Sequence, residues 1–156
     1  TIAVDDGLFL NNVPDSIQPG TNVRRVNGKR LDDEEMIEYY INIINEYGNN
    51  GILEGYFLKG ISIVYKNYTK SFEKKSSRTF INKRSNHLIE GYPLNSILII
   101  PSLNKYQSEL TDEEQSSLAD NEKVSIFEFI QDSINNLEEL IKKIKWRLFI
   151  YFFASV

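Results

Sequence analysis

The chain has 156 residues, of which 41% are hydrophobic, 12% aromatic and 26% charged, and its formal net charge is −4. This content excludes a collagen-like or wholly disordered chain, and the negative charge argues against indiscriminate nucleic-acid binding by the whole molecule. The absence of cysteine excludes disulfides and thiolate metal sites, and the single histidine disfavours histidine-based metal ligation or catalysis.

Short strands and turns are predicted for the first 31 residues. Apolar residues indicate strands beginning at residues 2 and 7, and the second is closed by a turn rich in Asn, Pro and Asp. Asn27-Gly28 is a dipeptide favoured in tight hairpin turns, because both residues accept positive φ. A hairpin is therefore expected around residues 27 and 28.

A helix is predicted after Asp32. Asp32 and Glu35 have the spacing of a capping box, and Gly48 is expected to end the helix in a left-handed conformation. Apolar residues between them recur at helical intervals and define one buried face: Met36, Ile37, Tyr40, Ile41, Ile44 and Tyr47.

Strand patterns return in residues 52–102, where β-branched and aromatic residues are frequent. Residues 1–102 are therefore predicted to form an α+β domain, with a small mixed β-sheet and one packed helix. Residues 103–124 are polar and acidic and are predicted to form a linker, with one helical turn near Thr111 and Glu114.

A long amphipathic, coiled-coil-like helix is predicted over residues 125–156. Ser125 and Glu128 have capping-box spacing, and apolar residues then step by three and four. The expected interface with a partner helix, or with a second copy of the chain, consists of Phe127, Ile130, Ile134, Leu137, Ile141, Ile144 and Leu148. The alternative is that this stripe packs on the chain's own domain.

The predicted helix ends in a cationic cluster at 142–147, which includes Trp146, and nine uncharged residues at 148–156. This order resembles the border of a membrane segment, but nine residues cannot span a bilayer. The run is either the start of a transmembrane helix or a buried helix end or strand. No signal peptide is recognised, so an intracellular location is predicted, with membrane association left open.

Residues 59–84 form a basic segment in which eight Lys or Arg residues accompany a single acid, Glu73. Aromatic residues are interleaved, a composition that suits anionic membrane head groups or single-stranded nucleic acid. The residues expected to bind such a surface are Lys66, Lys70, Lys74, Lys75, Arg78, Lys83 and Arg84. The alternative is a solvated face that balances the acidic helices of the same molecule.

No motif for catalysis or for binding a metal or cofactor is recognised. The carboxylate pairs Asp5-Asp6 and Asp32-Asp33 are interpreted as turn formers or helix caps, and His87 has no recognisable base or metal partner. No catalytic residue, metal site or cofactor is therefore predicted.

Residues 7–44 resemble part of a PDZ domain. Residues 7–16 are similar to the third strand of that family and its following turn, and residues 17–31 are similar to its Pro-Gly turn and Val-Asn-Gly hairpin. The helix after Glu34 stands where the groove helix would be, whereas the family's carboxylate loop would precede Thr1. The resemblance implies that a peptide adds as a strand beside residues 1–4, with Glu35 and Tyr39 lining the groove.

These patterns predict a non-enzymatic interaction or scaffold domain that associates through its C-terminal helix. The expected partner is another protein or a second copy, next to an anionic membrane surface. The alternative is a nucleic-acid-binding protein that uses the basic segment 59–84. A salt titration separates the two, because phosphate contacts weaken steeply with salt.

Overall fold

The computed structural model describes the backbone of residues 1–153 and the side chains of residues 1–118, 126–139 and 141–142. Its helices and strands are β1 (Ile2–Leu10), β2 (Arg25–Val26), β3 (Lys29–Arg30), α1 (Asp33–Tyr47), β4 (Ile52–Tyr65), β5 (Tyr68–Ile81), β6 (Leu98–Ile100), β7 (Lys105–Tyr106) and α2 (Asp112–Phe153). Short 3₁₀ helices lie at Asp15–Ile17, Pro93–Ser96 and Gln107–Glu109. The predicted α+β class is confirmed.

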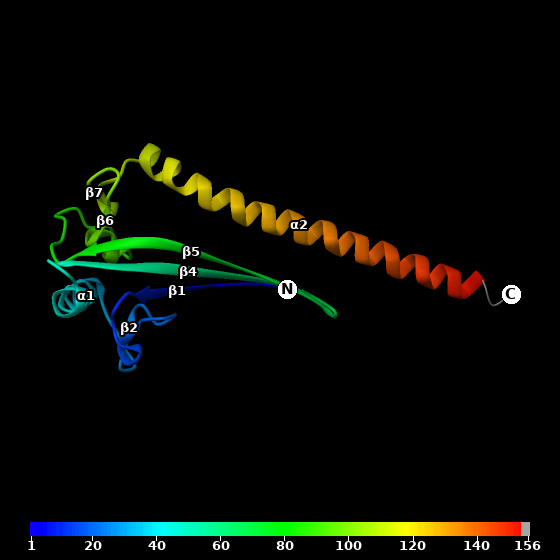
Figure 1. Ribbon diagram of the computed structural model, residues 1–156, viewed down its shortest axis with the longest axis horizontal. Coiled ribbons are helices and arrows are strands. Elements are labelled where there is room, and N and C mark those ends of the chain that lie inside the picture. The colour runs from blue at the N-terminus through cyan, green and yellow to red at the C-terminus, as the bar shows by residue number, and fades with distance from the viewer. Residues whose placement is uncertain (154–156) are drawn as a thin grey trace.

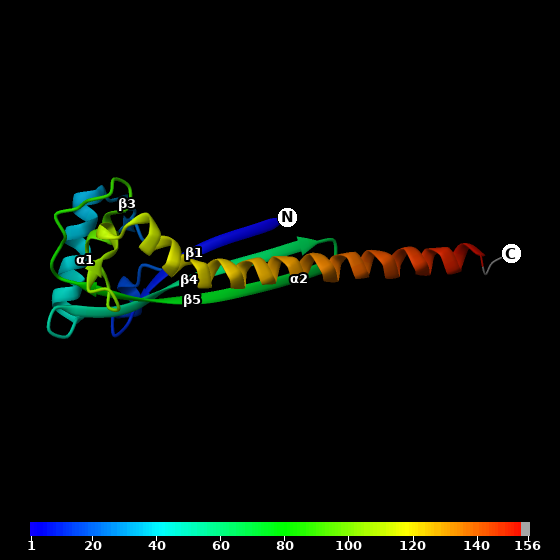
Figure 2. The ribbon, with the colours of Figure 1, turned by 90° about the horizontal axis from the view of Figure 1, so that it is seen from above.

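The main sheet has five strands in the order β1-β4-β5-β6-β7, and β2 and β3 form a separate hairpin. Every pair in the main sheet is antiparallel, so the predicted mixed sheet is wrong. Short connections such as the tight turn between β4 and β5 impose this direction, because parallel neighbours need a long crossover. The β4–β5 hairpin extends far beyond the body that surrounds α1 (Figures 1 and 2).

Helix α1 begins with the predicted capping box. The Glu35 backbone N–H donates to the Asp32 carboxylate at 2.8 Å, and the Asp32 N–H donates to the Glu35 carboxylate at 3.1 Å. The helix end differs from the prediction, because Gly48 has a φ of −80°. A Cβ at Gly48 would lie 2.4 Å from the Ile44 carbonyl oxygen, so glycine provides space here rather than a left-handed backbone.

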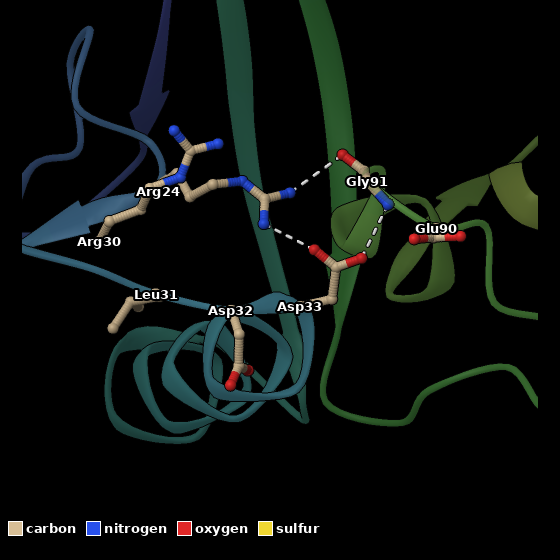
Figure 3. A pocket seen from close by; sticks show the side chains of 7 residues that line it. All are labelled: Arg24, Arg30, Leu31, Asp32, Asp33, Glu90 and Gly91. Atoms are coloured by element: carbon tan, nitrogen blue, oxygen red, sulfur yellow. Dashed lines mark hydrogen bonds and ion pairs between the residues drawn. The ribbon is translucent and has the colours of Figure 1, made fainter.

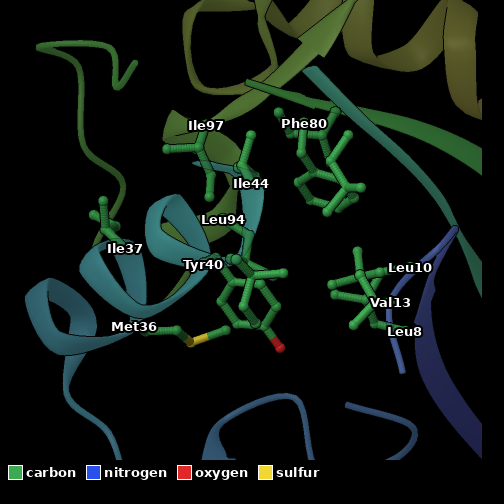
Figure 4. Packing of buried hydrophobic residues seen from close by; sticks show 13 residues of the cluster. Leu8, Leu10, Val13, Met36, Ile37, Tyr40, Ile44, Phe80, Leu94 and Ile97 are labelled. Atoms are coloured by element: carbon green, nitrogen blue, oxygen red, sulfur yellow. The ribbon is translucent and has the colours of Figure 1, made fainter. Parts of the chain in front are cut away.

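Two hydrophobic clusters stabilise the sheet. The α1 cluster joins α1 to one end of the sheet (Figure 4) and consists of Leu8, Leu10, Val13, Met36, Ile37, Tyr40, Ile43, Ile44, Leu53, Phe80, Leu94, Ile97 and Leu98. The hairpin cluster joins the far part of β4 to α2, and its buried members among the described side chains are Ile61, Ile63 and Phe129.

Both clusters use one set of alternate residues in β4. Leu53, Ile61 and Ile63 all have odd numbers, and residues two apart in a strand point to the same face. The register between β4 and β5 is unbroken, so the twist of the strands carries this face from α1 round to α2. Figure 1 shows the two helices on opposite sides of the hairpin. This face is termed the helix-facing side of the sheet.

Helix α2 begins at Asp112 rather than at residue 125. The Thr111 N–H donates to the Glu114 carboxylate at 2.9 Å, and the Glu114 N–H donates to the Thr111 hydroxyl at 3.2 Å. Acidic residues are favourable in the first turn of a helix, so the acidic residues from 112 onward continue the helix instead of forming a linker. Only residues 101–111 connect β6 to α2, through β7 and a 3₁₀ turn.

The predicted apolar seam of α2 is divided between two faces. Ile130 and Leu137 pack against the hairpin cluster, whereas Phe127, Ile134 and Ile141 are 67%, 44% and 36% exposed. A single coiled-coil-like stripe is therefore not supported.

Among the apolar side chains of α2 that the structure describes, the most buried is that of Phe129, which the predicted seam omitted. Its ring stacks on Phe72 with the centroids 5.2 Å apart. The side chains of Ile144 and Leu148, and residues 154–156 of the terminal apolar run, lie outside the described residues. Among the described residues, no helix has both the length and the apolar content needed to cross a membrane.

Candidate functional site

A row of charged side chains crosses the sheet between the two hydrophobic clusters. Asp6 of β1 is paired with Lys59 of β4, and Lys59 is paired with Lys74 of β5. Directly opposed residues of antiparallel strands project from the same face. A carboxylate and two ammonium groups therefore occupy one cross-strand row, which is termed the charged row.

The charged row lies on the helix-facing side of the sheet. In β4, Phe57 precedes Lys59 by two residues and packs against the α1 cluster, and Ile61 follows by two residues and is buried in the hairpin cluster. Asp6 is exposed, and Lys59 and Lys74 are half-buried. The row is thus a strip of polar surface with apolar packing on both sides.

Asp5 and Asp6 lie within β1, so the prediction that this pair forms a turn is wrong. Successive residues of a strand point to opposite faces, which leaves Asp6 alone in the charged row. The Asp5 carboxylate accepts a hydrogen bond from the Asp6 backbone N–H at 3.0 Å. One carboxylate therefore faces the candidate site, and its neighbour serves the backbone.

The chain segment after Pro19 is attached to β1 next to this row. The Leu8 N–H donates to the Gly20 carbonyl at 2.8 Å, and the Gly20 N–H donates to the Leu8 carbonyl at 2.9 Å. Gly7 permits this approach, because a Cβ there would lie 3.3 Å from the carbonyl carbon and oxygen of Gly20. The segment that leads into β2 therefore leaves β1 two residues from Asp6.

An open cavity of about 470 Å³ lies at the N-terminal end of α1 (Figure 3). Its lining residues are Arg24, Arg30, Leu31, Asp32, Asp33, Glu90 and Gly91. The Arg24 guanidinium donates to Asp33 at 2.6 Å and to the Gly91 carbonyl at 2.9 Å, and the Gly91 N–H donates to Asp33 at 2.8 Å. The hydrogen bond from Arg24, followed by the one from Gly91, lowers the pKa of Asp33 below its usual value.

The cations of the basic segment do not form one surface. Lys74 and Arg78 lie on the helix-facing side, and Arg78 stands 5.7 Å from the centre of the Phe57 ring. Lys75 points to the other face, 4.6 Å over the Tyr56 ring. The alternation of β5 thus divides neighbouring cations between two faces.

The remaining cations of this segment have separate environments. Lys70 pairs with Asp132 of α2 and lies 5.7 Å from the Phe129 ring, and the paired carboxylate raises the pKa of Lys70. Arg84 pairs with Glu34 of α1. Lys66 is in the turn between β4 and β5, with a φ of 51°, and Lys83 is exposed after β5.

Both side chains that were predicted to line a peptide groove, Glu35 and Tyr39, make contacts within the chain itself. The Glu35 carboxylate is engaged by Lys29 as well as by the capping box, and Tyr39 packs edge-on against Tyr40. At the end of β1, the Gln18 side chain accepts a hydrogen bond from the Leu10 N–H at 2.9 Å and donates one to the Leu10 carbonyl at 2.6 Å.

No family model matches the chain, and no curated protein matches it in sequence. Solved structures do match. The Staphylococcus aureus Ham1 protein has a TM-score of 0.53 and 25% identity over 74% of this chain. A nucleoside-triphosphatase, described as a dITP/XTP pyrophosphatase, from Mycobacterium abscessus has a TM-score of 0.62 and 17% identity over 80% of this chain. A HAM1 protein from Coxiella burnetii has a TM-score of 0.56 and 17% identity over 74%.

The chain shares the fold of these proteins. It spans 57%, 64% and 58% of the lengths of the three solved structures.

This likeness overturns the PDZ resemblance and the predicted scaffold function. The matched structures are Ham1 proteins and a nucleoside-triphosphatase, so the predictions of a non-enzymatic scaffold and of a nucleic-acid-binding protein are wrong. The resemblance depended on a Val-Asn-Gly hairpin followed by a helix, which is a local pattern. In the structure that hairpin stands apart from the main sheet.

Sequence reasoning missed Asp6 and Lys59. One signal could have identified Asp6. It lies within a strand, where aspartate is rare, and an uncommon residue in such a position indicates a functional role. The signal for Lys59 depended on the register of β1 with β4, which no local pattern specifies. Lys74 was predicted, but as part of an anionic-surface patch.

Proposed function

We propose that the chain acts as a nucleoside triphosphate pyrophosphatase, which hydrolyses a phosphoanhydride bond and releases pyrophosphate. The observation that carries the proposal is the charged row of Asp6, Lys59 and Lys74 within a fold shared with a nucleoside-triphosphatase. The likeness to the Ham1 protein at 25% identity supports the same fold.

The charged row has the groups that this reaction needs. Lys59 and Lys74 offset the negative charge of the phosphates, and Asp6 accepts a proton from the attacking water. The water oxygen bonds to the α-phosphorus while the bond to the α–β bridging oxygen breaks, which yields a nucleoside monophosphate and pyrophosphate. A Mg²⁺ ion that arrives with the triphosphate fits a single carboxylate, since Mg²⁺ is commonly held by one or two carboxylates together with substrate phosphates.

The test measures pyrophosphate release by the 156-residue chain from magnesium complexes of dITP, XTP, ATP and GTP. Asp6→Asn is expected to lower kcat/KM by about 10²–10⁴-fold, the usual contribution of a general base. The matched control is Asp5→Asn, which changes the neighbouring carboxylate on the opposite face and keeps an oxygen that accepts from the Asp6 N–H. This control is expected to retain activity.

Two results would contradict the proposal. One is the absence of both pyrophosphate release and nucleotide binding, measured by calorimetry, with every nucleotide of the panel. The other is an equal loss of activity in the Asp5 and Asp6 variants, because a role in the charged row distinguishes the two carboxylates.

A further inference from the structure

The β2–β3 hairpin has four cations in residues 24–30, and two of them have no ion-pair partner among the described residues. Arg24 is paired with Asp33 and Lys29 with Glu35. Within the part of the chain that the structure describes, Arg25 and Arg30 form no ion pair, and both side chains are exposed.

The hairpin geometry places these two arginines side by side. Asn27 and Gly28 have φ values of 49° and 82° and form a two-residue turn, after which Val26 is paired with Lys29 and Arg25 with Arg30. The Leu31 N–H donates to the Arg24 carbonyl at 2.9 Å. Hydrogen-bonded and non-hydrogen-bonded pairs alternate along an antiparallel ladder, so Arg25 and Arg30 form a pair that is not hydrogen-bonded. Residues in such a pair are the closest cross-strand neighbours and project from the same face.

Like charges directly opposite each other destabilise an isolated hairpin. Among the described acids that line the cavity, Asp33 binds Arg24, Asp32 caps α1, and Glu90 forms no ion pair with either arginine. In Figure 3 the Arg24 guanidinium reaches Asp33 and Gly91, whereas no dashed line joins Arg30 to a carboxylate of the cavity. A bound polyanion removes this repulsion, and guanidinium groups match phosphate oxygens in a bidentate manner.

The arginine pair also has a defined position relative to the charged row. The segment before the hairpin is attached to β1 by the Leu8–Gly20 hydrogen bonds, two residues from Asp6. The Tyr40 hydroxyl donates to the Val23 carbonyl at 2.9 Å and fixes the start of the hairpin on α1. Arg30 lines the cavity that opens at this end of the helix.

We infer that Arg25 and Arg30 bind the phosphate chain of the nucleoside triphosphate. This inference rests on the proposed function and adds the residues that determine affinity for the triphosphate. The pair holds the phosphates while the reacting bond lies at the charged row, so it contributes to binding and not to the proton transfer.

The test uses a double variant, Arg25→Gln with Arg30→Gln, and two ligands. Calorimetry with inorganic triphosphate measures phosphate binding without a nucleoside, and steady-state kinetics with dITP measure KM and kcat. We expect the dissociation constant and KM each to rise about tenfold or more, because the variant loses charge-assisted hydrogen bonds to the phosphates. We expect kcat to be retained. The control is Lys29→Gln, which removes the same charge from the same hairpin at a paired position and leaves both constants near those of the parent.

A second variant, Arg25→Lys with Arg30→Lys, keeps the charge and removes the bidentate geometry. It is expected to bind inorganic triphosphate more weakly than the parent and more tightly than the glutamine variant. The thermal unfolding temperature of the glutamine variant should equal or exceed that of the parent, because a repulsive pair has been removed.

An unchanged affinity for inorganic triphosphate in both double variants would overturn the inference, even where hydrolysis proceeds normally. Equal weakening by Lys29→Gln would also overturn it, because the effect would then follow net charge. Arginine-dependent binding of inorganic triphosphate without hydrolysis of any nucleotide would refute the proposed function and leave the anion site in place.

Discussion

The α1 cluster and the hairpin cluster hold opposite ends of one sheet, yet they differ greatly in extent. Among the side chains that the structure describes, the first buries thirteen residues, eleven of them in two helical segments and four strands, whereas the second buries Ile61, Ile63 and Phe129. Free energy from apolar burial grows with the area removed from water. The α1 end is therefore expected to be the more stable part of the molecule, and the long hairpin with α2 extends from it as an arm.

The largest loss of stability is expected from Phe80→Ala, a substitution in the α1 cluster. Phe80 is 1% exposed and lies between Leu53 and Leu98 across the sheet. Its truncation should lower the free energy of unfolding by about 3–5 kcal/mol, measured by urea denaturation. Tyr92→Ala, which removes a ring that is 66% exposed, is the control and should have little effect. Similar midpoints for the two variants would show that the α1 cluster is not the stabilising body.

A smaller and local effect is expected from Phe129→Ala. This ring packs α2 against the hairpin. Its loss should lower the opening free energy of amides in α2 and the hairpin by about 1–3 kcal/mol, whereas the opening free energy of amides in α1 should not change. Native-state hydrogen exchange measures both regions in one experiment.

The matched control for the anchor is Phe127→Ala, two residues earlier and 67% exposed. It should leave hydrogen exchange unchanged. A larger effect at Phe127 than at Phe129 would restore the predicted seam as the packing face and remove the distinction between the two faces of α2.

The smallest effect concerns pH and the ion pair beside the cavity. Because Arg24 and Gly91 lower the pKa of Asp33, the charged carboxylate stabilises the folded state above its unfolded pKa of about 4. This contribution is lost as the pH falls through the lower folded value. Thermal unfolding between pH 7 and pH 2 should therefore show a shallower decline for Asp33→Asn than for the parent.

Glu35 and Glu114 also have lowered pKa values, through their bonds to Lys29 and Lys105, so part of the acid sensitivity should remain in Asp33→Asn. Asp15→Asn is the control, since the Asp15 side chain has no ion pair in the described part of the chain. A decline in Asp33→Asn as steep as that of the parent would show that the Arg24 network contributes nothing to stability.

The charged row lies between these two regions, and this position explains why its members escaped prediction. Asp6 was interpreted as a turn former because aspartate pairs are common in turns, but strand pairing with β4 places it in the sheet. Glu35 was assigned to a groove, although its capping role was also predicted and is confirmed. Local signals identified the caps at Asp32 and Thr111, but they also predicted a helix start at Ser125, which lies inside α2.

The sequence by itself determined the features that depend on neighbouring residues: the capping box of α1, the Asn27-Gly28 turn and most of the apolar face of α1, although the prediction omitted the buried Ile43. Each is decided by backbone preference and hydrogen bonds within a few residues, so no distant contact can easily change it. The tertiary structure alone decided that Asp6, Lys59 and Lys74 share a row and that Phe129 rather than Phe127 anchors α2. Those outcomes depend on register between distant strands and on the twist that carries one face of β4 from α1 to α2, and both are set by long-range packing.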